Sequence, residues 1–151
     1  MTTHTIVPCT VADGAALSRN NISAFWQDSN WVLSWRHTTL EDHIVEIAKR
    51  VQRILVSSRE TLRHQKAVDP ETGRILGYCR WILPPSHATL ADGRPVWPEA
   101  MVPAVSPEEE AEIQRVAATA IFNPNKETDP LDDKVTQIKN ELMGRKPYLR
   151  A

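Results

Sequence analysis

Apolar residues recur at three- and four-residue spacing over residues 40–55, and this pattern predicts the clearest helix of the chain. Charged residues fall largely on the opposite side, so one face would pack against the rest of the protein. Thr38 and Glu41 have the spacing of a capping box at the start of this helix. The apolar face comprises Leu40, Ile44, Ile47, Ala48, Val51, Ile54 and Leu55.

Two further stretches predict the sheet. Residues 5–9 are a short apolar strand, and Thr10 and Asp13 then favour the start of a helix over 11–25. Residues 61–68 and 74–83 read as two strands joined by a tight turn that ends at Gly73. Both faces of the second of these strands are apolar, which predicts a central strand covered on both sides.

The second half of the chain predicts a loop and two helices. Residues 84–105 are rich in proline and predict a long surface loop that Trp97 could pin down. Ser106 opens a helix that ends at Asn123, with an apolar stripe of Ile113, Val116, Ala117, Ala120 and Ile121. Asp129 opens another that ends near Gly144, with a stripe of Leu131, Val135, Ile138 and Leu142. Residues 147–151 read as the beginning of a strand. We therefore expect one α/β domain over 1–151, with an antiparallel sheet flanked by helices.

Composition excludes several classes of function. The 151 residues carry 18 basic and 19 acidic side chains, so no basic excess favours a nucleic acid partner. No apolar run approaches the length of a membrane span, and no signal peptide opens the chain, which favours the cytoplasm or nucleus. Cys9 and Cys79 are expected to be free thiols, and no ligand spacing predicts a metal site.

Four segments carry a family resemblance: residues 6–17, 24–25, 66–81 and 145–149. In this order they resemble the N-terminal half of the GNAT superfamily of N-acetyltransferases, in particular GNAT-like proteins common in fungi. The resemblance implies a GNAT-like sheet and a parent reaction that transfers an acetyl group from acetyl-CoA to an amine. It also implies that the catalytic residues belong to later strands, so no catalytic residue is assigned among these positions.

The cofactor-binding segment of that family has no counterpart here. In GNAT proteins a glycine-rich loop opens a helix whose backbone N–H groups hold the pyrophosphate of acetyl-CoA. The five glycines of this chain belong to other predicted features, so no cofactor-binding residue is assigned and no cofactor is expected for this chain alone. Three readings stay open: a fragment of a longer acetyltransferase, a half-fold completed by a second chain, or a separate α/β interaction module. An open sheet edge would favour self-association or pairing with a missing C-terminal half.

The resemblance also suggests where an amine substrate would bind. In GNAT proteins the segment between the first two helices borders the acceptor cleft. In this chain that segment contains Trp31, Trp35, Arg36 and His37. The alternative is that the tryptophans cover the edge of the sheet while Arg36 and His37 face solvent. Trp81 could point at the reacting centre or belong to the core. His43 could act as a general base or be an ordinary helix histidine.

Overall fold

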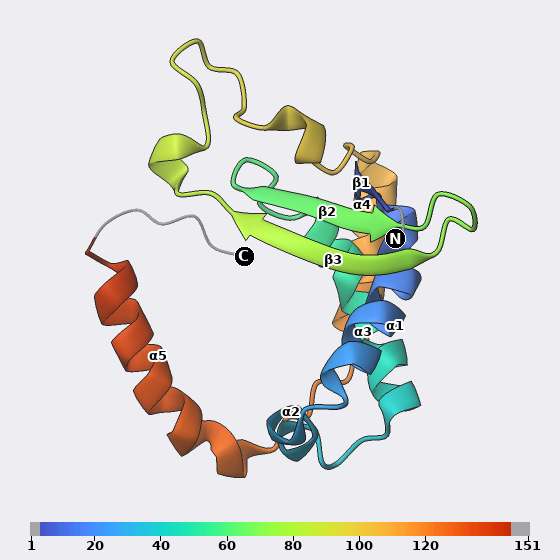
Figure 1. Ribbon diagram of the computed structural model, residues 1–151, viewed down its shortest axis with the longest axis vertical. Helices are drawn as coiled ribbons and strands as arrows, with labels where there is room; N and C mark the ends of the chain where they lie inside the picture. The colour runs from blue at the N-terminus through green and yellow to red at the C-terminus, as the bar shows by residue number, and fades with distance from the viewer. Residues whose placement is uncertain (1–3, 146–151) are drawn as a thin grey trace.

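Three antiparallel strands form the sheet of the computed structural model, which describes residues 4–145 (Figure 1). The strands are β1 (Thr5–Pro8), β2 (Leu62–Val68) and β3 (Ile75–Ile82), and they lie in the order β1-β2-β3. Gly73 closes the β2–β3 turn with a φ of +70°, a conformation that a residue without a Cβ adopts at little cost. The predicted antiparallel sheet flanked by helices is therefore confirmed.

Two helices, α1 (Gly14–Phe25) and α3 (Leu40–Val56), pack together on one face of the sheet. The one-turn helix η1 (Val11–Asp13) opens α1, and Thr10 and Asp13 form the predicted capping interaction. The shorter α2 (Ser29–Ser34) lies between the two long helices in sequence. The core of this layer combines a residue at the end of β1, one residue from each of the two helices and one from a distant loop: Cys9, Leu17, Leu55 and Val102.

The start of α3 differs by one residue from the predicted capping box. Thr39 is the N-cap residue, and its hydroxyl oxygen accepts a hydrogen bond of 3.2 Å from the amide of Asp42. The hydroxyl also donates to the Asp42 carboxylate at 2.7 Å, so Thr39 and Asp42, rather than Thr38 and Glu41, make the capping contacts. Sequence spacing alone could not distinguish the two registers because Thr38 and Thr39 are both capping residues.

A buried arginine holds the excursion over residues 84–106 against the other face of the sheet. The Arg63 side chain is fully buried, and its Nε donates to the carbonyl oxygens of Val96 and Trp97 at 2.9 and 3.0 Å. Its Nη1 donates to the carbonyls of Arg59 and Leu62 at 2.9 and 2.8 Å. The predicted surface loop is thus only partly at the surface. It contains the short helices η2 (Pro85–His87) and η3 (Pro98–Ala100), and it buries Ala88, Ala100 and Val102.

After this excursion, α4 (Pro107–Ala118) packs against α3. Its predicted start is confirmed, because the Ser106 hydroxyl oxygen accepts a 3.1 Å bond from the amide of Glu109. The predicted end at Asn123 is wrong: the helix stops at Ala118, and Ile121 is 71% exposed beyond it. Beyond the helix, the Ile121 amide donates to the carboxylate of Glu46 at 2.6 Å.

The last helix, α5 (Asp129–Met143), stands apart from the sheet in Figure 1. Within residues 4–145 its packing contacts are to the adjoining one-turn helix η4 (Lys126–Thr128). The predicted stripe residues Val135, Ile138 and Leu142 are 65%, 50% and 50% exposed. The helix is therefore present as predicted, but these three residues of its apolar stripe are half or more exposed.

The position of β3 corrects the sequence prediction. Its two apolar faces predicted a central strand, yet among the described residues β3 pairs only with β2 and forms an edge of the sheet. One face lies over α1, and Trp81 on the strand approaches Trp97 of the excursion with ring centroids 5.9 Å apart. Because α1 covers one face of β3 and the excursion covers the other, the apolar pattern of β3 is explained without a further strand. The strand predicted over 147–151 lies outside the described residues.

Replacing Arg63 should lower stability strongly. We expect Arg63→Ala to reduce the free energy of unfolding by about 3 kcal/mol or more, because it removes charge-assisted hydrogen bonds and leaves buried carbonyls without donors. Urea denaturation of both proteins measures the change. Arg94→Ala, which removes an exposed guanidinium from the same excursion, is the control and should change stability by less than about 0.5 kcal/mol. Equal effects would contradict a stabilising role of Arg63.

Two isoleucines on different helices test the packing of α5. Ile113 on α4 is 5% exposed, whereas Ile138 on α5 is half exposed. Ile113→Ala should therefore cost about 2–4 kcal/mol, and Ile138→Ala less than about 0.5 kcal/mol. The same denaturation experiment compares them. A large loss in Ile138→Ala would mean that α5 packs against a surface in solution.

Candidate functional site

Aromatic rings connect the helices at the end of the molecule where α1, α2 and α3 meet. Phe25 stacks on Trp31 with centroids 4.8 Å apart, and Trp31 lies 6.1 Å from Trp35. Trp35 in turn lies 4.1 Å from the His43 ring and 5.0 Å from Phe122. We call these five residues the aromatic cluster. It joins the α1–α3 layer to the segment that follows α4, and two cavities open beside it.

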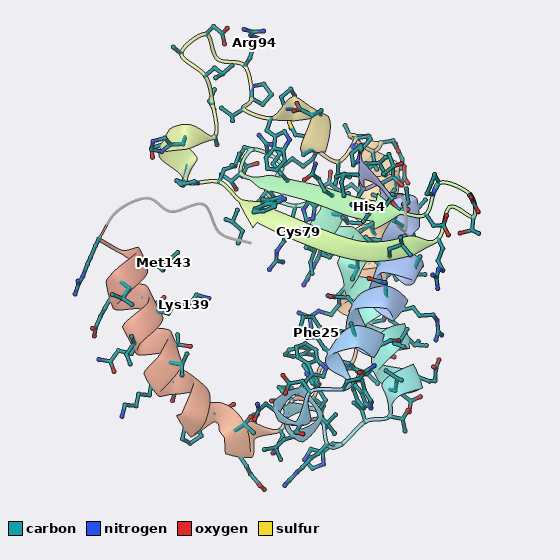
Figure 2. All side chains as sticks on the ribbon, in the orientation of Figure 1. His4, Phe25, Cys79, Arg94, Lys139 and Met143 are labelled. Atoms are coloured by element: carbon teal, nitrogen blue, oxygen red, sulfur yellow. The ribbon has the colours of Figure 1, made fainter. Side chains whose placement is uncertain are left out.

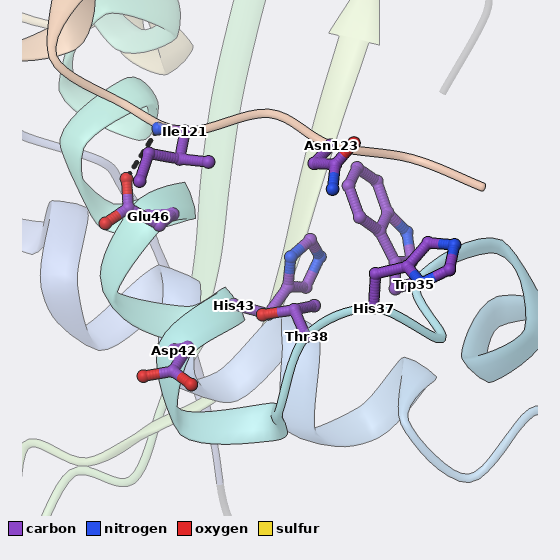
Figure 3. A pocket seen from close by; sticks show the side chains of 8 residues that line it. All are labelled: Trp35, His37, Thr38, Asp42, His43, Glu46, Ile121 and Asn123. Carbon is purple, nitrogen blue, oxygen red and sulfur yellow. Dashed lines mark hydrogen bonds between the residues drawn. The ribbon is translucent and has the colours of Figure 1, made fainter. Parts of the chain in front are cut away.

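The first cavity, here called the polar pocket, has a volume of about 230 Å³ (Figure 3). Its walls come from the α2–α3 connection, the first turns of α3 and the segment after α4. Asn125 fixes that segment through two hydrogen bonds. Its backbone N–H donates to the carbonyl of Ser34 at 2.7 Å, and its side-chain NH2 group donates to the carbonyl of Leu33 at 3.2 Å. The residues that line the pocket are Trp35, His37, Thr38, Asp42, His43, Glu46, Ile121 and Asn123.

His43 places a neutral imidazole in the polar pocket. The residue is 3% exposed, and Figure 3 shows its ring among the lining side chains. Burial lowers the pKa of His43, and the nearby charge of Arg50 lowers it further. The His43 Nε2 atom is buried and has no hydrogen-bond partner among the described residues. A neutral ring with an unbonded nitrogen can accept a proton or a hydrogen bond from a bound ligand.

Two carboxylates line the pocket, of which Glu46 is paired with Lys49 whereas Asp42 has no cationic partner among the described residues. Asp42 bonds to the Thr39 hydroxyl through one oxygen, and Glu46 bonds to Lys49 at 2.6 Å as well as to the Ile121 amide. The hydrogen bond from Lys49 and that from the Ile121 amide lower the pKa of Glu46. No lysine or arginine is among the residues that line the pocket. Carboxylates beside aromatic rings favour a cation, such as a protonated amine.

The second cavity, here called the apolar groove, has a volume of about 400 Å³ and lies between α1, α3 and β3. Trp31 and Phe25 belong to both the aromatic cluster and this groove. Twelve residues line it: Leu17, Ser18, Asn21, Ile22, Phe25, Trp31, Ile47, Val51, Ile54, Tyr78, Cys79 and Arg80. Most of them are apolar, so the groove differs in chemistry from the polar pocket.

The half-buried Tyr78, which lines the apolar groove, contacts the buried His64 of β2. The Tyr78 hydroxyl and the Nδ1 atom of His64 are 2.8 Å apart. Burial, together with the charge of Arg80, lowers the pKa of His64 to about 4, and burial raises that of Tyr78. Both groups are therefore neutral at physiological pH.

The structure brings together only some of the predicted site residues. Trp35 and His37 line the polar pocket, and Trp31 lines the apolar groove. Arg36 instead points to Glu127, with which it forms an exposed ion pair at 2.7 Å. Trp81 is separate, because its indole donates to Gln65 at 3.3 Å and its ring faces Trp97.

Of the remaining lining residues, sequence reasoning named His43 as a possible general base but did not select Asp42, Glu46, Ile121 or Asn123 as site residues. Asp42, His43 and Glu46 lie within two turns of one helix, and the spacing of Asp42 and Glu46 places them on one face. This spacing was the available signal. Asn123 and Ile121 reach the pocket only through the tertiary fold, and no local pattern indicates that.

No family model, curated protein or solved structure matches this chain. Within residues 4–145, Cys9 and Cys79 are free, as predicted, and no group of metal-binding side chains is found. None of the helices described for this part of the chain is long and apolar enough to cross a membrane. The site is therefore interpreted from its geometry.

The His64–Tyr78 pair predicts a dependence of stability on pH. The folded-state pKa of His64 is about 4, against an ordinary 6.5, so the unfolded chain binds a proton that the folded chain does not. Stability should be complete above pH 6.5 and fall by up to about 3 kcal/mol as the pH drops to 4. Urea titrations across this range measure the slope. His64→Gln should flatten it, whereas exposed His87→Gln should not, and a His64→Gln slope as steep as that of the parent would contradict the account.

Proposed function

We propose that this chain carries the acceptor side of a GNAT-like N-acetyltransferase, and that the acceptor amine binds in the polar pocket. The order of elements supports this: a strand, helices on one face of the sheet, then two antiparallel strands. This order matches the segments that resemble the GNAT family. The observation that carries the choice of pocket is the negative, partly aromatic cavity beside Trp35, in the segment expected to border an acceptor cleft.

The chemistry of the pocket suits an amine. Asp42 and Glu46 would attract its protonated form, and the faces of Trp35 and His43 would add a favourable cation–π contribution. The protonated amine must first lose one proton so that its nitrogen can attack. Acetyl transfer then forms the bond between nitrogen and acetyl carbon and breaks the thioester bond, and the second proton lost by the nitrogen is balanced by protonation of the leaving thiolate to the free thiol of CoA. His43 is the candidate general base for the first of these protons, and the burial and the Arg50 charge that lower its pKa make it a weak one. The proposal assigns acetyl-CoA binding to residues other than these.

A second candidate function is that of an interaction module that pairs with another polypeptide. The exposed stripe of α5 favours it, because a helix of 15 residues that makes almost no tertiary contacts is marginally stable in water. The two candidates differ in a measurable way. An acceptor-binding chain takes up small amines through the polar pocket, whereas a module of this second kind binds only through its apolar surfaces.

Calorimetric titration with tryptamine tests the amine site. We expect tryptamine to bind, and its N-acetyl derivative to bind at least tenfold more weakly because it has lost the charge, a difference of about 1.4 kcal/mol. Asp42→Asn, which keeps the capping geometry, should weaken tryptamine binding by a similar factor. Asp92→Asn removes a remote exposed carboxylate and serves as the matched control. Equal binding by amine and amide, or no effect of Asp42→Asn, would contradict the proposal.

A further inference from the structure

The apolar groove opens along the free side of the sheet. Its lining includes three consecutive residues of β3, Tyr78 to Arg80, and none of β2. Consecutive residues of a strand point to opposite faces, so Tyr78 and Arg80 direct their side chains to the same face of β3. In Figure 2 the labelled Cys79 lies on β3 and the labelled Phe25 at the end of α1, the two elements that border this opening together with α3.

The backbone of β3 is available at that edge. The strand is eight residues long, and in the described part of the chain it has a strand partner only on the side of β2. At its beginning, the side chain of Asn20 donates to the carbonyl of Ile75 at 3.3 Å. The outward-facing N–H and C=O groups beyond this point form a ready template for another extended segment.

Two donors at the groove have no partner among the described residues, the guanidinium of Arg80 in ion pairs and the indole of Trp31 in hydrogen bonds. The exposed guanidinium of Arg80 forms no ion pair with the described residues, and no aspartate or glutamate lines the groove. The indole Nε1–H of Trp31 is buried and has no acceptor among those residues. An occupant that supplies a carboxylate and carbonyl oxygens would satisfy both groups.

We propose that the β3 edge and the apolar groove together form a docking surface for an extended acidic polypeptide segment. Such a segment adds a strand beside β3, places every second side chain in the groove and directs a carboxylate toward Arg80. Main-chain hydrogen bonds would supply affinity, and the groove and Arg80 would select apolar and acidic side chains. This inference does not rest on the proposed acetyl transfer.

Charge argues against a second copy of this chain as the occupant. The β3 sequence contains no acidic residue, and Arg80 is its one charged side chain. Pairing β3 with the same strand of another copy would place two guanidinium groups on one short sheet edge without a carboxylate. A separate acidic segment removes this repulsion and forms an ion pair instead.

A synthetic peptide tests the docking surface on the intact chain. The probe has eight residues, blocked ends and alternating valine and threonine, with one threonine replaced by glutamate. Calorimetry and backbone NMR should show binding, with the largest shifts at Tyr78, Cys79 and Arg80. A peptide N-methylated at alternate residues on the edge that faces β3 should bind at least tenfold more weakly, because it cannot donate hydrogen bonds to the edge.

Charge reversal supplies the second arm of the experiment. Arg80→Glu should weaken binding of the glutamate peptide at least tenfold and strengthen binding of a matching peptide with lysine in place of glutamate. Arg94→Glu should change neither affinity. Failure of the parent peptide to bind, or equal binding of the N-methylated peptide, would overturn the proposal. Sedimentation showing dimers that the peptide dissociates would overturn the choice of occupant. The tryptamine titration reads out a different cavity, so failure of one proposal leaves the other to be judged separately.

Discussion

The buried guanidinium of Arg63 determines how the second half of the chain is placed on the first. Its bonds to the carbonyls of Val96 and Trp97 fasten the excursion to the sheet. A charge can be buried here because backbone carbonyls surround it, which offsets the loss of hydration. The excursion then delivers α4 onto α3, and the segment after α4 reaches the bond between Ile121 and Glu46. One wall of the polar pocket thus depends on a side chain on the opposite face of the sheet.

This arrangement leaves one side of the molecule open for binding. The excursion covers part of one sheet face, and α1 and α3 cover the other, while among the described residues the outer edge of β3 has no strand partner. The two cavities at this side share the aromatic cluster but differ in charge. Carboxylates line the polar pocket, and Arg80 marks the rim of the apolar groove. A small cation and an acidic segment could therefore bind at neighbouring sites without competing for the same groups.

Periodicity predicted the elements better than it predicted their environment. The apolar stripe from Leu40 to Leu55 predicted α3 correctly. The period of such a stripe identifies a helix whatever surface its apolar face packs against. The two apolar faces of β3 indicated a central strand, but Trp97 arrives from the excursion to face Trp81, a contact between distant residues that no strand pattern contains. His43 shows the same limit, since its burial follows from aromatic rings contributed by other segments.

The central claim is that this chain provides the acceptor side of an acetyltransferase and leaves acetyl-CoA binding to other residues. Calorimetric titration of the folded chain with acetyl-CoA tests it most directly, with circular dichroism and near-ultraviolet spectra confirming the fold in the same buffer. The account predicts no binding heat, because no glycine-rich loop follows a strand to hold the pyrophosphate. Stoichiometric binding at micromolar affinity would contradict it and would place a cofactor site of another kind within these residues.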